Sequence, residues 1–489
     1  MSQLRPHQIK AREMILQAWA AGERPMLAAP CSFGKTILAA TMMKELAEEH
    51  GQTSVFFCDR LRLVQQTTAT FDRLGCEYSV MQGDDWRYDT RKKIHIVSIQ
   101  TAVRRKMIPF DAAFIDEAHT LYAGMKAMMD NWDVVRICGL SATPLSKGLG
   151  QYFNRLLVPI TPRQLIKDGY LTPTEYYVGR SVDVSNVKTR ALATGGTDFD
   201  PQDLARAVEA DKLLSGDVIE NYLAHAKGKK AMCFTPSIAH SKELVTKFNQ
   251  AGIRAVHIDG YMDTEERDII YSGLKAGMYD VISCSRLLGV GFDQTDIECL
   301  IMCQPTKSLM WYVQTWGRGV RTHPGKEKLI YLDHSGCLQR IGRFPEDIVP
   351  TSLDDGSKVF REKNQVKEKD EREAKIWECP QCHSACTGWA CACGYSLPRT
   401  TRLYTDNQIL ERLERDKTVQ QQWFSELLLY ASKKGYKQGW AYHKFLDKFK
   451  VKPEGLSFAK AENLSPDVTK YIQYINIRSA HARTNTRKA

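Results

Sequence analysis

The stretch APCSFGKT, at residues 29–36, decides how the rest of the chain is interpreted. It ends like the phosphate-binding pattern G-x-x-x-x-G-K-[ST], but alanine stands where that pattern has its first glycine. A short apolar run at 26–29 precedes it and a helical pattern at 37–49 follows, so we expect a strand, a loop and a helix. That order directs free backbone N–H groups and the positive end of a helix at a bound phosphate.

Three residues of this stretch have chemical roles at a nucleotide. Gly34 lets the backbone approach the phosphates, Lys35 can reach the outer phosphates, and the Thr36 hydroxyl can bind Mg²⁺. The methyl group of Ala29 is tolerable at a strand end if that residue keeps a negative φ. A solvent-exposed Gly-Lys turn that binds nothing is the alternative from this stretch alone.

The composition is that of a globular protein of two to four domains. The 489-residue chain is 43% hydrophobic, and no apolar run approaches the 18 residues of a membrane-spanning helix. The first residues are polar and basic and do not resemble a signal peptide, so we expect an intracellular protein without membrane contacts. The net charge of +11 suits a polyanionic partner.

Two series of apolar runs alternate with helical patterns. Because helices separate the runs, each series should form a parallel sheet that is covered on both faces. We therefore expect one α/β domain over 1–170 and a second over 171–350. The strands are expected at 54–59, 94–99, 112–116 and 135–140 in the first domain, and at 231–235, 254–259, 280–284, 299–304 and 328–333 in the second.

The sequence changes character after the second α/β domain. Residues 351–376 are polar and mixed in charge, which predicts a linker or an exposed helix. A cysteine-rich segment follows at 377–397, and residues 398–489 are helical in pattern. From 402 onward, 17 Lys and Arg stand against 9 Asp and Glu. Within the second domain, residues 183–212 predict a polar loop and a short helix.

Five of the 14 cysteines lie in the cysteine-rich segment, and their spacing predicts a zinc ribbon. Cys379 and Cys382 form a C-x-x-C pair, and Cys391 and Cys393 form a shorter C-x-C pair. Four thiolates can hold Zn²⁺ in a tetrahedron, and the metal would stabilise so small a segment. Cys386 can replace Cys391, because the second pair is short. A reduced, metal-free loop is the alternative.

Two carboxylates and two hydroxyls follow strands of the first domain. Beside a phosphate loop, Asp116 can bind Mg²⁺, and Glu117 can orient and deprotonate an attacking water. Ser141 and Thr143, in LSATP, can couple the two domains through hydrogen bonds. A helix cap before proline is the alternative for these hydroxyls.

The second domain contains YVQTWGRGVR at 312–321. Arg318 and Arg321 are three residues apart, which places them on one helix face, and an arginine supplied across an interface accelerates phosphoryl transfer. Gln314 can help to place the water. Asp293, in LLGVGFDQ, is expected near the cleft between the domains. An ordinary basic helix is the alternative for 312–321.

The order of these motifs resembles that of superfamily 2 helicases over residues 1–335. LRPHQ resembles the motif whose glutamine reads adenine, which maps to Gln8. FFCDRLRLVQQ and IVSIQTA resemble the next two motifs, and they imply nucleic-acid contacts by Arg60, Gln100 and Thr101. DEAH resembles motif II, SAT motif III, CFTPSIAHS motif IV, GVGFD motif V and QTWGRGVR motif VI.

Within that superfamily, LIKDGYLTPTE, IDGYMDTEERD and QPTKSLMWYVQTWGRGVR are most similar to RadD-like bacterial proteins and related phage helicases, and motif II is of the DEAH type. The resemblance implies two RecA-like domains, with ATP in the cleft and nucleic acid across the top. It predicts an ATP-, Mg²⁺- and Zn²⁺-binding DNA helicase or translocase, monomeric, in the cytoplasm of a bacterial or phage-infected cell. Single-stranded, forked or branched DNA and proteins of replication or recombination are its expected partners. An RNA helicase and a non-catalytic DNA-binding adaptor are the alternatives.

The basic C-terminal segment interleaves aromatic residues and lysines at 435–453. Such a pattern suits stacking on bases together with phosphate contacts, and Lys437 and Lys444 are the candidates. The same aromatic residues can instead form the core of a small helical domain. We favour the core for most of them, which are Trp440, Tyr442, Phe445 and Phe449.

Overall fold

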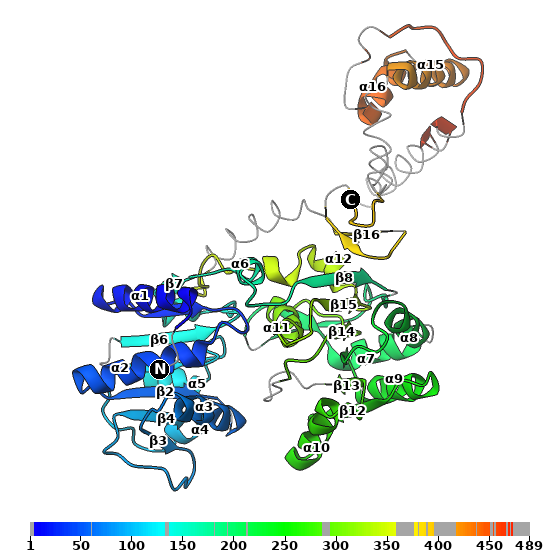
Figure 1. Cartoon of the computed structure of the whole chain (residues 1–489). Coiled ribbons are helices and arrows are strands. Elements are labelled where there is room, and N and C mark those ends of the chain that lie inside the picture. Colours follow the sequence, from blue (N-terminus) through cyan, green and yellow to red (C-terminus); the bar gives the residue numbers. More distant parts are fainter. Residues whose placement is uncertain are drawn as a thin grey trace. The chain divides into compact units, whose positions relative to one another are not determined.

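The chain forms two compact units, Met1–Tyr395 and Ser396–Ala489, and each is described by itself (Figure 1). No helix among the described residues has the length and apolar character needed to cross a membrane. The computed structural model describes residues 4–59, 61–132, 136–179, 181–192, 194–211, 214–285, 294–357, 376–379, 381–387, 390–395, 417–436, 438–449, 453, 456–465, 468–469 and 471–472.

The first α/β domain is built on a seven-stranded parallel sheet in the order β3-β4-β2-β5-β6-β1-β7. The expected strands are confirmed, and β3 and β7 are additional. The strands are β1 (Pro25–Ala28), β2 (Ser54–Cys58), β3 (Tyr78–Met81), β4 (Ile94–Ser98), β5 (Ala112–Ile115), β6 (Arg136–Ser141) and β7 (Arg155–Leu157).

Helices cover both faces of this sheet, which is why its strands read as continuous apolar runs. Helices α1, α2 and α3 pack on one face, and α4 and α5 pack on the other, each face with its own apolar cluster. The helices are α1 (Pro6–Ala20), α2 (Lys35–His50), α3 (Leu61–Arg73), α4 (Ile99–Ala102) and α5 (Ala123–Asp130), with the 3₁₀ turn η1 (Leu149–Gln151) after β6.

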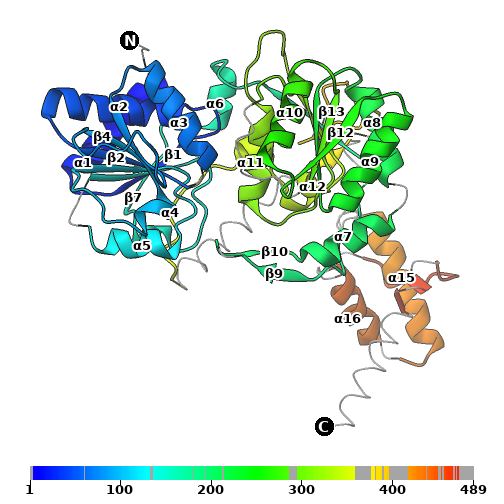
Figure 2. The ribbon, with the colours of Figure 1, turned by 90° about the horizontal axis from the view of Figure 1, so that it is seen from below.

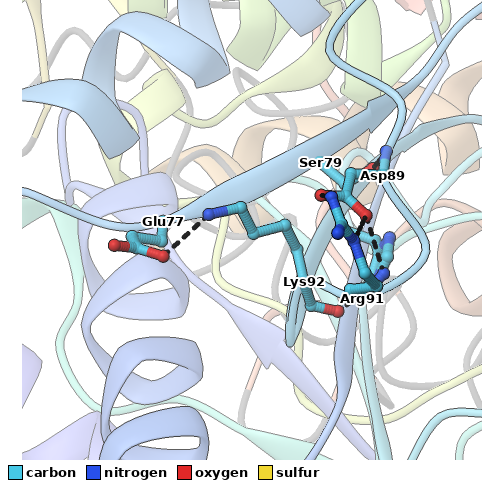
Figure 3. A network of polar contacts seen from close by, with 6 residues as sticks. Glu77, Ser79, Asp89, Arg91 and Lys92 are labelled. Atoms are coloured by element: carbon cyan, nitrogen blue, oxygen red, sulfur yellow. Dashed lines mark hydrogen bonds and ion pairs between the residues drawn. The ribbon is translucent and has the colours of Figure 1, made fainter.

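Polar contacts, rather than a core, fix the segment that joins β3 to β4 (Figure 3). Lys92 Nζ lies 2.7 Å from Glu77 Oε2, and Arg91 Nε lies 3.0 Å from Asp89 Oδ1. The Asp89 backbone N–H donates to Ser79 Oγ at 2.9 Å. Exposed pairs of this kind each stabilise a fold by less than about 1 kcal/mol, so they set the path of the segment more than its stability.

The second α/β domain has a six-stranded parallel sheet in the order β12-β13-β11-β14-β15-β8. All five strands expected in this domain are confirmed. Its edge strand, β8, comes directly after the join between the domains. The strands are β8 (Thr174–Val178), β11 (Ala231–Thr235), β12 (Ala255–Asp259), β13 (Val281–Ser285), β14 (Cys299–Met302) and β15 (Leu329–Asp333).

Helices again lie on both faces, with α8 and α9 on one and α10, α11 and α12 on the other. Alternate residues of β11 lie on opposite faces of the sheet. Met232 and Phe234 belong to one apolar cluster, and Ala231 and Cys233 belong to the other. The helices are α6 (Pro162–Lys167) at the join, α8 (Leu214–His225), α9 (Ile238–Gln250), α10 (Thr264–Lys275), α11 (Leu309–Gly319), α12 (Cys337–Ile341) and the 3₁₀ turn η2 (Pro345–Asp347).

The polar loop predicted for 183–212 is wrong in its first half. Strands β9 (Thr189–Ala191) and β10 (Thr197–Phe199) form an antiparallel hairpin before α7 (Pro201–Ala210) (Figure 2). Gly195 and Gly196 both have positive φ and supply the turn. A segment that is distant in the sequence holds the hairpin in place. Asp198 accepts hydrogen bonds from Thr306 Oγ1 at 2.7 Å and from the Lys307 N–H at 2.8 Å.

Two segments that lie outside the first domain form hydrogen bonds with the same loop of that domain, the loop after β6. The tip of the hairpin contributes the Thr194 carbonyl, which accepts from the Lys147 N–H at 2.8 Å. The polar segment after the second domain contributes the Asp354 carbonyl, which accepts from the Gly150 N–H at 2.8 Å. Residues 351–357 are therefore packed against the first domain, and residues 358–375 lie outside the described part.

The cysteine-rich segment contains a short antiparallel pair, β16 (Trp377–Glu378) and β17 (Ala385–Cys386). It lies along the outer edge of β8. The Val178 N–H donates to the His383 carbonyl at 2.9 Å, and Tyr177 forms an isolated bridge with Ser384. The segment thereby covers backbone groups that an edge strand would otherwise leave open to other chains.

The C-terminal unit is helical, as expected, and has a small core of its own. Helices α15 (Lys417–Lys433) and α16 (Gln438–Phe449) pack against each other. Phe424, Leu427 and Phe445 are fully buried between them. The preference for a core role is confirmed for Phe445, Trp440 is half-buried and packs against this core, and Tyr442 is half-buried. The side chain of Phe449 lies outside the described part.

We expect Gly139→Ala to destabilise the first domain. A Cβ at Gly139 would lie 2.7 Å from Phe153 Cζ and 2.8 Å from Met26 Cε, in a fully buried site. Overpacking of this kind costs about 1–3 kcal/mol. Thermal unfolding followed by circular dichroism should show a lower Tm, and Phe153→Leu should recover part of the loss in the double variant. An unchanged Tm for Gly139→Ala would contradict this packing.

Candidate active site

The phosphate-binding loop joins β1 to α2. Lys35 is the first residue of α2, and Gly34 precedes it with φ of +86°. A Cβ on Gly34 would lie 2.4 Å from Gln8 Nε2, so both space and conformation require glycine there. Ala29 has no positive φ, and its N–H donates to the Ser141 carbonyl at 2.8 Å. The alanine that departs from the usual pattern therefore belongs to the strand end, as expected.

Gln8 braces this loop from α1. Its Nε2 donates to the carbonyls of Phe33 and Gly34 at 3.1 and 3.2 Å, and its Oε1 accepts from the Arg5 N–H at 2.8 Å. The side chain is buried. The contact of Gln8 with adenine, which the resemblance implies, stays a prediction.

Charges of both signs face each other beside the loop, with Asp116 buried and Lys35 and Glu117 half-buried. Lys35 Nζ lies 3.6 Å from Glu117 Oε1. Burial and the neighbouring charge of Glu117 raise the pKa of Asp116. Burial alone would also raise the pKa of Glu117, but the charges of Lys35, His119 and Arg318 outweigh it and lower that pKa. Glu117 is therefore a carboxylate near neutral pH.

These residues fit a nucleotide and a divalent cation. Gly34 leaves room beside the first turn of α2, whose N–H groups lack partners within the helix. Burial opposes the charge of Lys35, but the carboxylates of Glu117 and Asp116 raise its pKa, so its amine stays protonated. The hydroxyl of Thr36 and the carboxylate of Asp116 are oxygen ligands of the kind that Mg²⁺ prefers.

A chain of hydrogen bonds links this site to the second domain. His119 Nδ1 lies 3.0 Å from Ser141 Oγ, and the Thr143 N–H donates to the same Oγ at 3.0 Å. From α11, Gln314 Nε2 lies 3.3 Å from His119 Nε2 and 3.3 Å from Thr143 Oγ1. The helix-cap alternative for LSATP is wrong, since Ser141 ends β6 and no helix begins at Thr143.

Helix α11 also places an arginine at the site, but only one of the two expected arginines lies on that helix. Arg318 lies on α11, and its charge helps to lower the pKa of Glu117. The shared helix face predicted for Arg318 and Arg321 is wrong, because α11 ends at Gly319. Arg321 lies beyond that end, where its charge interacts with Cys31 of the phosphate-binding loop. A Cβ on Gly317 would lie 2.2 Å from Cys31 Sγ, so α11 packs directly on the loop.

A cavity of about 370 Å³ opens at the carboxyl ends of three neighbouring strands of the first sheet. Asp59 follows β2, Gln100 follows β4 and Tyr122 follows β5, and all three line it together with Val103 and Arg104. The Tyr122 hydroxyl donates to Asp59 Oδ2 at 3.0 Å. The ring is thereby held while Tyr122 remains 44% exposed.

This cavity contains one expected nucleic-acid residue and adds two that the sequence did not single out. Gln100 lines it, whereas Thr101 Oγ1 accepts from the Gly83 N–H at 3.2 Å. Tyr122 and Arg104 were missed, although an aromatic residue five positions after Glu117 was a usable signal. The expected site residues Arg60, Asp293 and Lys437 lie outside the described part of the chain.

Four thiolates gather in the cysteine-rich segment. The sulfur atoms of Cys379, Cys382, Cys391 and Cys393 all lie within 4.8 Å of one another, a donor set that suits tetrahedral Zn²⁺. Cys386 is not in this group, and its Sγ donates to the Ser384 carbonyl at 3.5 Å. The structure therefore favours Cys391 over Cys386 as the fourth ligand.

In the C-terminal unit, Lys444 lies on α16, and its carbonyl accepts from the Tyr471 hydroxyl.

Two family profiles match the chain in succession. "Type III restriction enzyme, res subunit" matches residues 1–146, and "Helicase conserved C-terminal domain" matches residues 215–323. The solved structure of "ATP-dependent Type ISP restriction-modification enzyme LlaBIII bound to DNA" superposes with a TM-score of 0.53 at 16% identity, over 91% of this chain and 36% of that one. That likeness concerns the fold, and the expected pair of RecA-like parallel-sheet domains is confirmed.

Two relatives are similar in sequence over 62% of the chain. The "51.5 kDa protein" of Lactococcus phage (isolate 7-9) is 28% identical over 312 residues, which are 62% of this chain and 64% of the relative. "Putative ATP-dependent helicase IRC3" of Saccharomyces cerevisiae is 25% identical over 333 residues, which are 62% of this chain and 47% of the relative. The chain thus spans less than two thirds of either relative. With both domains matched in order, the two α/β domains are those of a superfamily 2 helicase-type enzyme.

Proposed function

We propose that the protein is an ATP-dependent DNA helicase or translocase that unwinds or remodels duplex, forked or branched DNA in replication, recombination or repair. The observation that carries the proposal is the contact of Gln314 with His119 and Thr143. It joins α11 of the second domain to the residues beside Glu117. A change in the nucleotide site can therefore alter how tightly the two domains are held together.

In this proposal each residue of the site has one task. Lys35 places a positive charge at the outer phosphates, and Thr36 and Asp116 would hold Mg²⁺, which neutralises phosphate charge when bound. Glu117 is ionised, so it can accept a proton from the attacking water. Arg318 adds positive charge from the second domain where charge develops.

Nucleic acid is proposed to cross the carboxyl ends of the strands, where the Tyr122 cavity lies. An exposed aromatic ring beside an amide and a guanidinium suits a base and its phosphate. DNA is preferred over RNA because the structural neighbour named above was solved bound to DNA. An RNA helicase is the second candidate, since the contacts described for the cavity do not distinguish the sugars. We further propose a monomer that works in the cytoplasm of a bacterial or phage-infected cell.

Glu117→Gln tests the hydrolytic role. The variant should bind a fluorescent ATP analogue about as tightly as the wild type, because Lys35 and the loop are unchanged. Its turnover stimulated by nucleic acid should fall by a factor of about 10² or more, because the amide cannot accept the proton. Glu49→Gln, an exposed change on α2, is the matched control and should hydrolyse ATP normally. Wild-type protein without nucleic-acid-stimulated hydrolysis would refute the proposed function.

Tyr122→Ala tests the nucleic-acid path. Loss of one stacked base should weaken binding of a single strand by about 1–3 kcal/mol, whereas Tyr122→Phe keeps the ring and should stay close to the wild type. Fluorescence anisotropy with matched DNA and RNA oligonucleotides, together with ATPase stimulation by each, checks the site and the preference for DNA. Stronger stimulation by RNA would favour the second candidate.

We also propose one structural Zn²⁺ per chain, held by the four clustered thiolates. Elemental analysis should find about one equivalent, and Cys382→Ser should release it and expose 377–397 to proteases while basal ATPase activity is kept. Cys386→Ser is the matched control, because its sulfur lies outside the group, and it should retain the metal. Equal zinc content in the two variants would contradict this ligand set.

A further inference from the structure

Three aromatic rings meet on the surface of the C-terminal unit, where α15 ends and α16 begins. Tyr436 and Trp440 have ring centroids 5.2 Å apart, Tyr430 and Trp440 5.5 Å, and Tyr430 and Tyr436 6.4 Å. Tyr436 is 46% exposed, and the other two rings are half-buried. We call Tyr430, Tyr436 and Trp440 the aromatic platform.

A well-defined turn presents the platform. Gly435 has φ of +68°, and the Tyr436 N–H donates to the Ala431 carbonyl at 2.8 Å, which closes the end of α15. Beneath the turn, Ala431 and Ala441 are buried in the core of the unit. That core already has its own large residues, so an exposed tyrosine at 436 is not needed to fill it.

The charge around the platform is positive. Lys433, Lys434 and Lys460 are exposed beside it, and Lys460 Nζ donates to Ser432 Oγ at 2.8 Å. Residues 427–446 include four lysines and no aspartate or glutamate. An anion is therefore the ligand that this surface favours.

The geometry narrows the class of anion. The rings touch one another at interplanar angles of 35° and 37° about Trp440, which leaves no cage for an ammonium group, and the lysines would repel a cation. Flat faces beside lysines suit unpaired bases that stack while their phosphates meet positive charge. We propose that the aromatic platform and Lys433, Lys434 and Lys460 form a binding site for single-stranded nucleic acid, separate from the two α/β domains.

Not every basic residue of this unit belongs to the site. Lys448 Nζ lies 4.7 Å from the Trp423 ring and 5.0 Å from the Tyr471 ring, so its charge is directed at core aromatics. The proposal goes beyond the motor function, because binding here needs no ATP hydrolysis. The two proposals can therefore fail separately.

The test uses the full chain without nucleotide and a fluorescein-labelled oligothymidylate. Tyr436→Ala with Trp440→Ala should weaken binding roughly 5- to 150-fold for each stacked base that is lost. Tyr436→Phe with Trp440→Phe keeps the rings and should bind like the wild type. Tyr442→Ala, a half-buried aromatic change on α16 outside the platform, is the matched control and should also bind normally. Circular dichroism should show each variant folded.

The lysines are tested by salt dependence. Each phosphate contact on a single strand contributes about 0.7 to the slope of log affinity against log salt, so Lys433→Ala with Lys434→Ala should reduce that slope by up to about 1.4. ATPase activity at saturating nucleic acid should stay normal in all variants. Unchanged affinity and slope in the folded platform and lysine variants would overturn the site. If nucleic acid did not stimulate ATP hydrolysis by the wild-type protein, the proposed motor function would be refuted instead.

Discussion

All strands within each of the two large sheets point the same way, and the rest of the molecule depends on this constraint. Because the strands are parallel, the loops that follow them meet at one edge of each sheet. The first sheet gathers the phosphate-binding loop, Asp116 with Glu117, and the hydroxyls after β6 at that edge. The second sheet places α11 so that Gln314 reaches His119 and Thr143. The contact of Gln314 with His119 and Thr143 then links the two domains beside the nucleotide site, where α11 also packs on the phosphate-binding loop.

The sequence predicted the parts of this arrangement that depend on local pattern. Buried parallel strands are apolar throughout, so ten of them were recognisable as runs, and the loop at 29–36 was recognisable from three residues. Hairpin β9–β10 was not, because its strands are three residues long and largely polar. Its stability comes from Asp198 and the segment at 306–307, more than a hundred positions along the chain.

The candidate site shows the same division between local and distant determinants. The identity of Lys35, Glu117 and Arg318 as site residues came from motifs, but the place of Arg321 depended on where α11 ends. The spacing of the cysteines left two sets of four ligands open, and only the folded segment separates Cys386 from the group. Tyr122 is part of the candidate nucleic-acid site only because the ends of β2 and β4 lie beside it in space, although they are distant from it in the sequence.

The loop after β6 has a mechanical consequence. The hairpin tip is fixed to it at Lys147, and the segment after the second domain is fixed to it at Gly150, each through a backbone hydrogen bond. A body attached at two nearby points keeps one rotation that strains neither attachment, about the line that joins them. A rotation about this line would leave these two bonds intact, whereas twisting or sliding across it would break at least one of them. The loop thus favours rotation about one line, and it directly follows β6, whose end lies beside the contact between Thr143 and Gln314.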